Sequence, residues 1–166
     1  MKAFRRERDG SVSAVLEPEE VELLVQLATE SAALADAARA GAGLQADPAL
    51  IRLLPDAYPG DPAASAEFRR FTADGLAERK ATNARVVVET LASAGAGRIE
   101  VRLDTAASTS WLRAITDIRL VIGARLGIVQ DGDEGDVHDT ESALMRAAYD
   151  WLAWVQESLV NALTPR

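Results

Sequence analysis

The chain has 166 residues and a mass of 17.7 kDa, enough to bury a core of its own, and we expect a single domain over residues 1–166. Its 48% hydrophobic and 27% charged content is typical of globular proteins and excludes an intrinsically disordered chain. The absence of cysteine excludes disulfides, thiolate catalysis and zinc–thiolate sites, and the net charge of −8 disfavours nucleic-acid binding by the surface as a whole.

The N-terminal segments 3–8 and 11–16 flank Asp9-Gly10, a dipeptide typical of the two-residue turn of a β-hairpin. A helix is predicted to begin near Pro18, because proline suits the first helical turn and the acidic residues around it complement the helix dipole. Its apolar positions keep helical spacing up to Gly41, where we expect it to end.

Two Asp-Pro pairs mark the beginnings of the next two predicted helices. The pair at 47–48 opens a brief helix that Pro55 ends, and the pair at 61–62 opens a long helix that continues to about Ala94. Residues 98–103 then alternate charged and apolar side chains, the pattern of a half-buried strand. We expect this strand to join the hairpin in a small sheet.

Two further helices complete the predicted fold. Asp104 or Ser108 caps a helix whose apolar side chains recur every three or four residues, and an acidic loop at 131–139 precedes a final helix from about Thr140. The sequence therefore predicts an α+β fold that is predominantly α. It has four to five helices and a small antiparallel sheet made of the N-terminal hairpin and one strand near 98–103.

The acidic loop and the single histidine, His138, could in principle hold a hard cation, because carboxylates are the ligands such ions prefer. The loop lacks the order of ligands and glycine that an EF-hand requires, so a solvated acidic loop is the favoured interpretation. No serine lies in a nucleophile-elbow context, and no glycine-rich phosphate loop is present. We therefore predict no metal, no cofactor, no catalytic residue and no enzymatic activity.

Basic residues gather on two of the predicted elements. Arg5 and Arg6 lie on the hairpin, and Arg69 and Arg70 lie on the long helix. Pairing with neighbouring carboxylates is the simpler interpretation, while contact with an acidic protein or with DNA phosphates is the functional alternative. If the chain binds a macromolecule, these four arginines are the predicted contact residues.

Lys80 and Asn83 form a predicted polar cluster on the long helix. At 100° per residue they project on the same side as the apolar Leu76 and Val87. Polar groups turned toward a core need hydrogen-bond partners once they are buried. The two side chains therefore either tie the helix to a neighbouring element, which we favour, or line a polar pocket at its edge.

Four segments spread over nearly the whole chain resemble one known family. They are RLLPDAY at 52–58, EFRRFT at 67–72 with Lys80 and Asn83 downstream, WLRAITDIRL at 111–120, and YDWLAWVQESL at 149–159. In this order and spacing they are similar to a family of actinobacterial proteins long known as a domain of unknown function and named after the oxidative-stress regulator AosR.

The resemblance implies a transcriptional regulator of the oxidative-stress response that works with an extracytoplasmic-function sigma factor. The regulator that gives this family its name is described as sensing oxidation through a closely spaced cysteine pair. The present chain has no cysteine and cannot use that switch. We expect a cytoplasmic protein with a protein partner, DNA contact only through a local basic patch, and no membrane contact. A protein-only adaptor and a small-molecule-binding domain are the alternatives, and the oligomeric state is open, a homodimer included.

Overall fold

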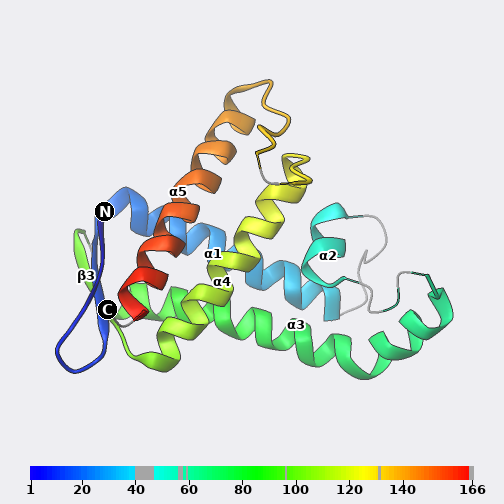
Figure 1. Ribbon diagram of the computed structural model, residues 1–166, viewed down its shortest axis with the longest axis horizontal. Helices are drawn as coiled ribbons and strands as arrows, with labels where there is room; N and C mark the ends of the chain where they lie inside the picture. Colours follow the sequence, from blue (N-terminus) through cyan, green and yellow to red (C-terminus); the bar gives the residue numbers. More distant parts are fainter. Residues whose placement is uncertain (40–46, 56–57, 59, 96, 131, 165–166) are drawn as a thin grey trace.

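The computed structural model describes residues 1–39, 47–55, 58, 60–95, 97–130 and 132–164, without the side chains of 62, 66 and 68–74. Within this part of the chain there are five helices and three strands (Figure 1). In chain order they are β1 (Lys2–Arg6), β2 (Val12–Leu16), α1 (Pro18–Arg39), α2 (Pro48–Leu53), α3 (Pro62–Ser93), β3 (Ile99–Leu103), α4 (Thr105–Arg125) and α5 (Thr140–Leu163).

The predicted α+β fold, mostly helical with a small antiparallel sheet, is confirmed. The predicted end of the first helix at Gly41 lies outside the described residues, and the prediction of a single domain stays a prediction. None of the described helices combines the length and the apolar character that crossing a lipid bilayer requires.

The three strands form an antiparallel sheet in the order β1-β2-β3. The turn between β1 and β2 contains Gly10, whose φ of 87° lies in the region that glycine adopts without strain. β3 pairs with β2 without interruption, from Val12 opposite Leu103 to Leu16 opposite Ile99. Because its residues alternate between buried and exposed, one face of the sheet lies against the helices and the other carries charged side chains.

Four helices begin in the same way, with an aspartate whose side chain accepts backbone N–H groups of the first turn. These residues are Asp47 for α2, Asp61 for α3, Asp104 for α4 and Asp139 for α5. Such a cap typically stabilises a helix by about 1 kcal/mol. Asp104 and not Ser108 therefore caps α4, and the Ser108 hydroxyl instead donates to the Asp104 carbonyl oxygen at 2.7 Å.

The helices pack into two hydrophobic clusters along α3, which runs the length of the molecule with the sheet at one end (Figure 1). The first, the sheet-end core, surrounds the fully buried Trp111, whose ring meets Phe4 edge-on with centroids 5.9 Å apart. Large side chains from the sheet, α4 and α5 fill it, among them Leu16, Leu103, Trp111, Ile115, Leu152 and Leu159.

The second cluster, the alanine core, lies between α1, α2 and α3. Small side chains fill most of it, namely Ala32, Ala35, Ala38, Ala49, Ala77, Ala81 and Ala84. Leu50 and Leu53 of α2 and Val121 of α4 close it. Alanine at facing positions lets two helices approach closely, and α1 accordingly lies alongside α3 (Figure 1).

Candidate functional site

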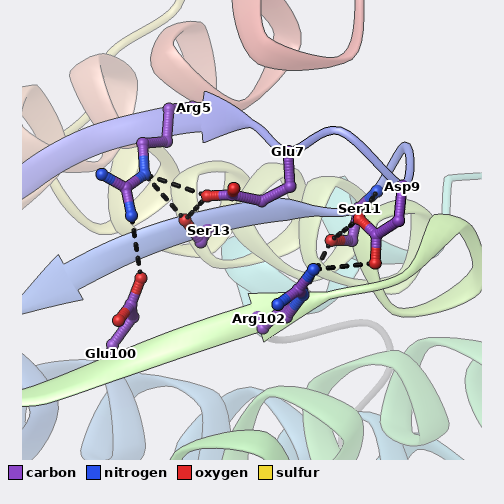
Figure 2. Close-up of polar contacts among 7 residues, drawn as sticks. All are labelled: Arg5, Glu7, Asp9, Ser11, Ser13, Glu100 and Arg102. Carbon is purple, nitrogen blue, oxygen red and sulfur yellow. Dashed lines mark hydrogen bonds and ion pairs between the residues drawn. The ribbon is translucent and has the colours of Figure 1, made fainter.

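Arg5 lies on the outer face of the sheet, where polar neighbours hold its guanidinium group (Figure 2). Its Nε donates to Ser13 Oγ at 3.1 Å, and its Nη2 donates to Glu100 Oε1 at 3.1 Å. Glu7 accepts from the same Nε at 2.9 Å and from the Ser13 hydroxyl at 2.5 Å. The Ser13 hydroxyl and then the Arg5 guanidinium stabilise this carboxylate and lower the pKa of Glu7 below its ordinary value of 4.5.

Arg102 forms a second cluster on the same face (Figure 2). It donates through Nη2 to Asp9 Oδ2 at 2.7 Å and through Nε to Ser11 Oγ at 2.9 Å. The hydrogen bonds from Ser11 and then the charge of Arg102 lower the pKa of Asp9 below its ordinary value of 3.8. Both guanidinium groups drawn in Figure 2 therefore have carboxylate partners within the face that carries them.

The other predicted contact arginines lie elsewhere. Arg6 donates through Nη1 to the Leu163 carbonyl oxygen at 3.1 Å, which places its charge at the C-terminal end of α5, where a cation complements the helix dipole. Arg69 and Arg70 fall on the first half of α3, and the side chains of these two residues are not among those described. That half of α3 is at the opposite end of the molecule from the sheet (Figure 1). The role of the four arginines as partner contacts stays a prediction.

Lys80 and Asn83, the predicted polar cluster, are brought together with residues of α4. They line an open pocket of about 460 Å³ between α3 and α4. Six of the described residues that line it are polar: Arg79, Lys80 and Asn83 from α3, and Arg113, Thr116 and Asp117 from α4. The structure thus adds two guanidinium groups and a carboxylate to the pair that the sequence indicated.

The pocket contains an ion pair that joins the two helices. Lys80 Nζ donates to Asp117 Oδ1 at 2.5 Å, and the two side chains are 18% and 7% exposed. Burial raises the pKa of Asp117 from its ordinary value of 3.8, and the hydrogen bond and charge of Lys80 offset this only in part. Lys80 therefore has both of the roles considered from the sequence, because it ties α3 to α4 and also lines the pocket.

Sequence reasoning did not assign Arg79, Arg113 or Asp117 to this pocket. Asp117 carried a usable signal, since it lies at helical spacing from the apolar Ala114 and Val121. A carboxylate in such a position requires a cation on the facing helix. Exposed arginines such as Arg79 and Arg113 occur on most protein surfaces, so their positions in the sequence do not by themselves indicate a pocket.

Two carboxylates of the acidic loop between α4 and α5 accept hydrogen bonds from the backbone of the loop or of the first turn of α5. Asp133 accepts two backbone N–H groups of the loop, at 2.9 and 3.0 Å, and Asp139 caps α5. His138 is 68% exposed, and its ring nitrogens lie 3.6 Å from Asp136 and from Asp139. Asp131 is outside the described residues, and elsewhere in the described part of the chain no group of three or more histidine, aspartate or glutamate side chains is placed to hold a metal ion.

Comparison with known proteins identifies a family model and several named relatives. The sequence model of a family described as "Domain of unknown function (DUF2017)" matches residues 1–163. The proteins named "Oxidative stress regulator AosR" from Mycobacterium bovis and Mycobacterium tuberculosis are each 32% identical to this chain over 130 residues. The alignment covers 70% of this chain but only 58% of each relative. The chain therefore spans little more than half the length of the curated relatives it matches. No solved structure matches the chain.

Proposed function

This chain belongs to the DUF2017 family, and from that premise we propose that it is a non-catalytic, cytoplasmic regulator of the oxidative-stress response that works by binding a protein partner. The observation that carries the proposal is its 32% identity, over 130 residues, to proteins named as oxidative stress regulators. Because that segment covers 58% of those proteins, their partners do not follow from their name.

The composition of the α3–α4 pocket supports binding rather than catalysis. Lys80 and Asp117, which could otherwise exchange protons with a substrate, hold each other at 2.5 Å. Arg79 and Arg113 supply guanidinium groups, which are hydrogen-bond donors without acceptor atoms. The Thr116 hydroxyl donates to the Leu112 carbonyl oxygen at 2.8 Å, so it is not paired with a base. These groups suit the recognition of a ligand better than the transfer of protons to it.

Charge supports a protein partner over direct contact with DNA. The chain carries a net charge of −8, which repels a polyanion at long range. Arg5, one of the predicted contacts, is already paired with Glu7 and Glu100, and phosphate would have to compete with both carboxylates. A sigma factor is the partner that the family resemblance implies. Since the chain has no cysteine, an oxidation signal would reach it through such a partner and not through a thiol of its own.

The test is a binding measurement with three components: the fluorescently labelled chain, an extracytoplasmic-function sigma factor from the same genome, and a promoter duplex. We expect anisotropy to report binding to the sigma factor alone and no binding to the duplex alone at physiological salt. The variants Arg5→Ala/Arg6→Ala and Arg69→Ala/Arg70→Ala should identify which end of the molecule is used. Loss of arginines at an interface centre should weaken binding about tenfold or more.

The matched control is Arg98→Ala/Arg125→Ala, which removes the same charge from exposed positions outside the predicted contacts. Its binding should equal that of the wild type. Binding of the duplex alone, with a steep salt dependence that the Arg5 or Arg69 variants flatten, would replace the protein partner by direct DNA contact. Failure of every tested sigma factor to bind would overturn the choice of partner.

A further inference from the structure

We propose that the α3–α4 pocket is a binding site for a small organic anion, a carboxylate or phosphate ester with an apolar body, and that Arg79 and Arg113 pair with its acidic group. Nothing in the similarity to stress regulators requires such a site. The inference goes beyond the proposed function and rests on three properties of the pocket: its unpaired cations, its ion pair and its mixed wall.

The first property is an excess of positive charge in a strongly acidic protein. Among the described side chains that line the pocket, three are cationic and one is a carboxylate, whereas the chain as a whole has a net charge of −8. Lys80 and Asp117 neutralise each other, which leaves the two guanidinium groups. Within the described part of the chain, neither Arg79 nor Arg113 has an ion-pair or hydrogen-bond partner, although most other described arginines do. Guanidinium groups bind carboxylates and phosphates through two parallel hydrogen bonds, which makes an oxyanion the ligand they fit.

The second property is the position of the ion pair at the base of the pocket. Lys80 and Asp117 are 18% and 7% exposed, while Arg79 and Arg113 are both exposed. Because the Asp117 carboxylate pairs with the Lys80 ammonium group, the charge of Lys80 is not available to bind an anion at the base of the pocket. An acidic group would therefore bind at the rim, between the two guanidinium groups, and the rest of the ligand would extend into the pocket.

The third property is the nature of the remaining wall. Leu76 of α3 and Leu112 of α4 supply apolar surface, and Asn83 supplies an amide that makes no hydrogen bond with any described residue. An inorganic ion would leave this surface unused. The volume of about 460 Å³ falls within the range of roughly 300–1,000 Å³ that is usual for sites of small organic ligands. A compact pocket of this size favours one small molecule over an extended peptide.

The experiment is a titration of the 166-residue chain with matched probes, followed by calorimetry and by amide chemical shifts. Benzoate and phenyl phosphate carry an acidic group on a ring, benzamide has the same shape as benzoate without the charge, and inorganic phosphate has the charge without the ring. We expect the two organic anions to bind and to shift amides of α3 and α4 around the pocket. Benzamide and inorganic phosphate should each bind at least about tenfold more weakly, because benzamide lacks the negative charge and inorganic phosphate lacks the apolar ring.

Variants then test the residues. Arg79→Gln/Arg113→Gln should lose binding about tenfold or more, and both positions are exposed, so the fold should be retained. Arg125→Gln changes the charge of α4 at a site outside the pocket and should leave binding unchanged. Asp117→Asn removes the carboxylate that pairs with Lys80 and frees the Lys80 ammonium, so it should tighten binding of both anions.

Several outcomes would overturn the proposal. Equal affinity for benzoate and benzamide would show that charge is not recognised, and unchanged binding by the Arg79/Arg113 variant would place the anion elsewhere. Absence of saturable binding by either organic anion would remove the site altogether. Binding of a short polyglutamate peptide through the same arginines, with no binding of the small anions, would reassign the pocket to an acidic segment of a protein partner.

Discussion

The two hydrophobic cores of this protein are held together in different ways. Large side chains fill the sheet-end core, where the Trp111 ring is fully buried and meets Phe4 edge-on. The alanine core is made mostly of methyl groups on α1 and α3, which allow the two helices to approach closely. The sheet-end core therefore depends on large side chains that fit together, and the alanine core depends on small side chains that let the helices approach. Truncation of a large side chain should therefore be most damaging in the sheet-end core, and enlargement of a small one in the alanine core.

Truncation should damage the sheet-end core most. Trp111→Ala should lower the free energy of unfolding by about 3–5 kcal/mol, because it removes a fully buried aromatic ring from the centre of the cluster and leaves a cavity. Urea denaturation followed by circular dichroism measures the loss. Trp154→Ala is the control, since Trp154 is 41% exposed and should change stability much less. Equal losses in the two variants would contradict the central position of Trp111.

Enlargement should damage the alanine core. Ala81→Leu should lower the free energy of unfolding by about 1–3 kcal/mol, since Ala81 is fully buried and extra methylenes would push neighbouring helices apart. Ala92→Leu adds the same volume at an exposed position of α3 and should be close to neutral. If Ala81→Leu were as stable as the wild type, the cluster would contain space that close packing does not leave.

Acidification should affect the sheet cluster and the α3–α4 ion pair in opposite directions, because the pKa of Asp9 is lowered and that of Asp117 is raised. The folded-state pKa of Asp9 is lowered, so its stabilising contribution is present above pH 3.8 and is lost as the pH falls through the folded value. The folded-state pKa of Asp117 is raised, so its contribution is present below pH 3.8 and is lost as the pH rises through the folded value. Asp117 therefore opposes part of the acid destabilisation that the sheet carboxylates cause.

Two variants sharpen this difference. Asp117→Asn should make the unfolding free energy fall more steeply as the pH is lowered toward 3.8, while Asp9→Asn should make the fall below that value shallower. Denaturant titrations at a series of pH values give both slopes. These effects should be smaller than those of the core substitutions. Parallel curves for the wild type and both variants would show that neither carboxyl shifts on folding.

The smallest effect is expected on the outer face of the sheet. Arg102→Ala removes hydrogen bonds to Asp9 and Ser11, but the Arg102 and Asp9 side chains are 60% and 59% exposed. Solvent screens such pairs, so the midpoint of thermal unfolding should fall by less than about 3 °C. Differential scanning calorimetry is sensitive enough to measure this. A drop comparable with that of Trp111→Ala would mean that the surface cluster holds the sheet together.

Local chemistry made most of the elements predictable from the sequence. The Asp-Pro pairs at 47–48 and 61–62 indicated the beginnings of α2 and α3 correctly, because capping and proline placement act within one helical turn. Asp9-Gly10 and the alternation at 98–103 likewise predicted the hairpin and β3, and the sheet that joins them is present. The division into two cores was not predictable, since it depends on which helices meet.

The candidate site was only half predictable for the same reason. Lys80 and Asn83 were indicated by their direction on one helix, which periodicity gives. Arg113 and Asp117 join them through the packing of α3 on α4, and the spacing along one chain does not encode that contact. The surface pairs of Arg5 with Glu100 and of Arg102 with Asp9 also connect residues more than 90 positions apart.

The alanine core has a further consequence for motion. Methyl groups project little beyond the backbone, so the ridges along α1 and α3 are low and resist lengthwise sliding weakly. Small shear between packed helices is one of the established ways in which proteins change shape. Because α3 is one continuous helix from this cluster to the sheet end, it would move as a rigid unit. A displacement of its N-terminal half would therefore be transmitted to the Lys80–Asp117 ion pair, which joins α3 to α4.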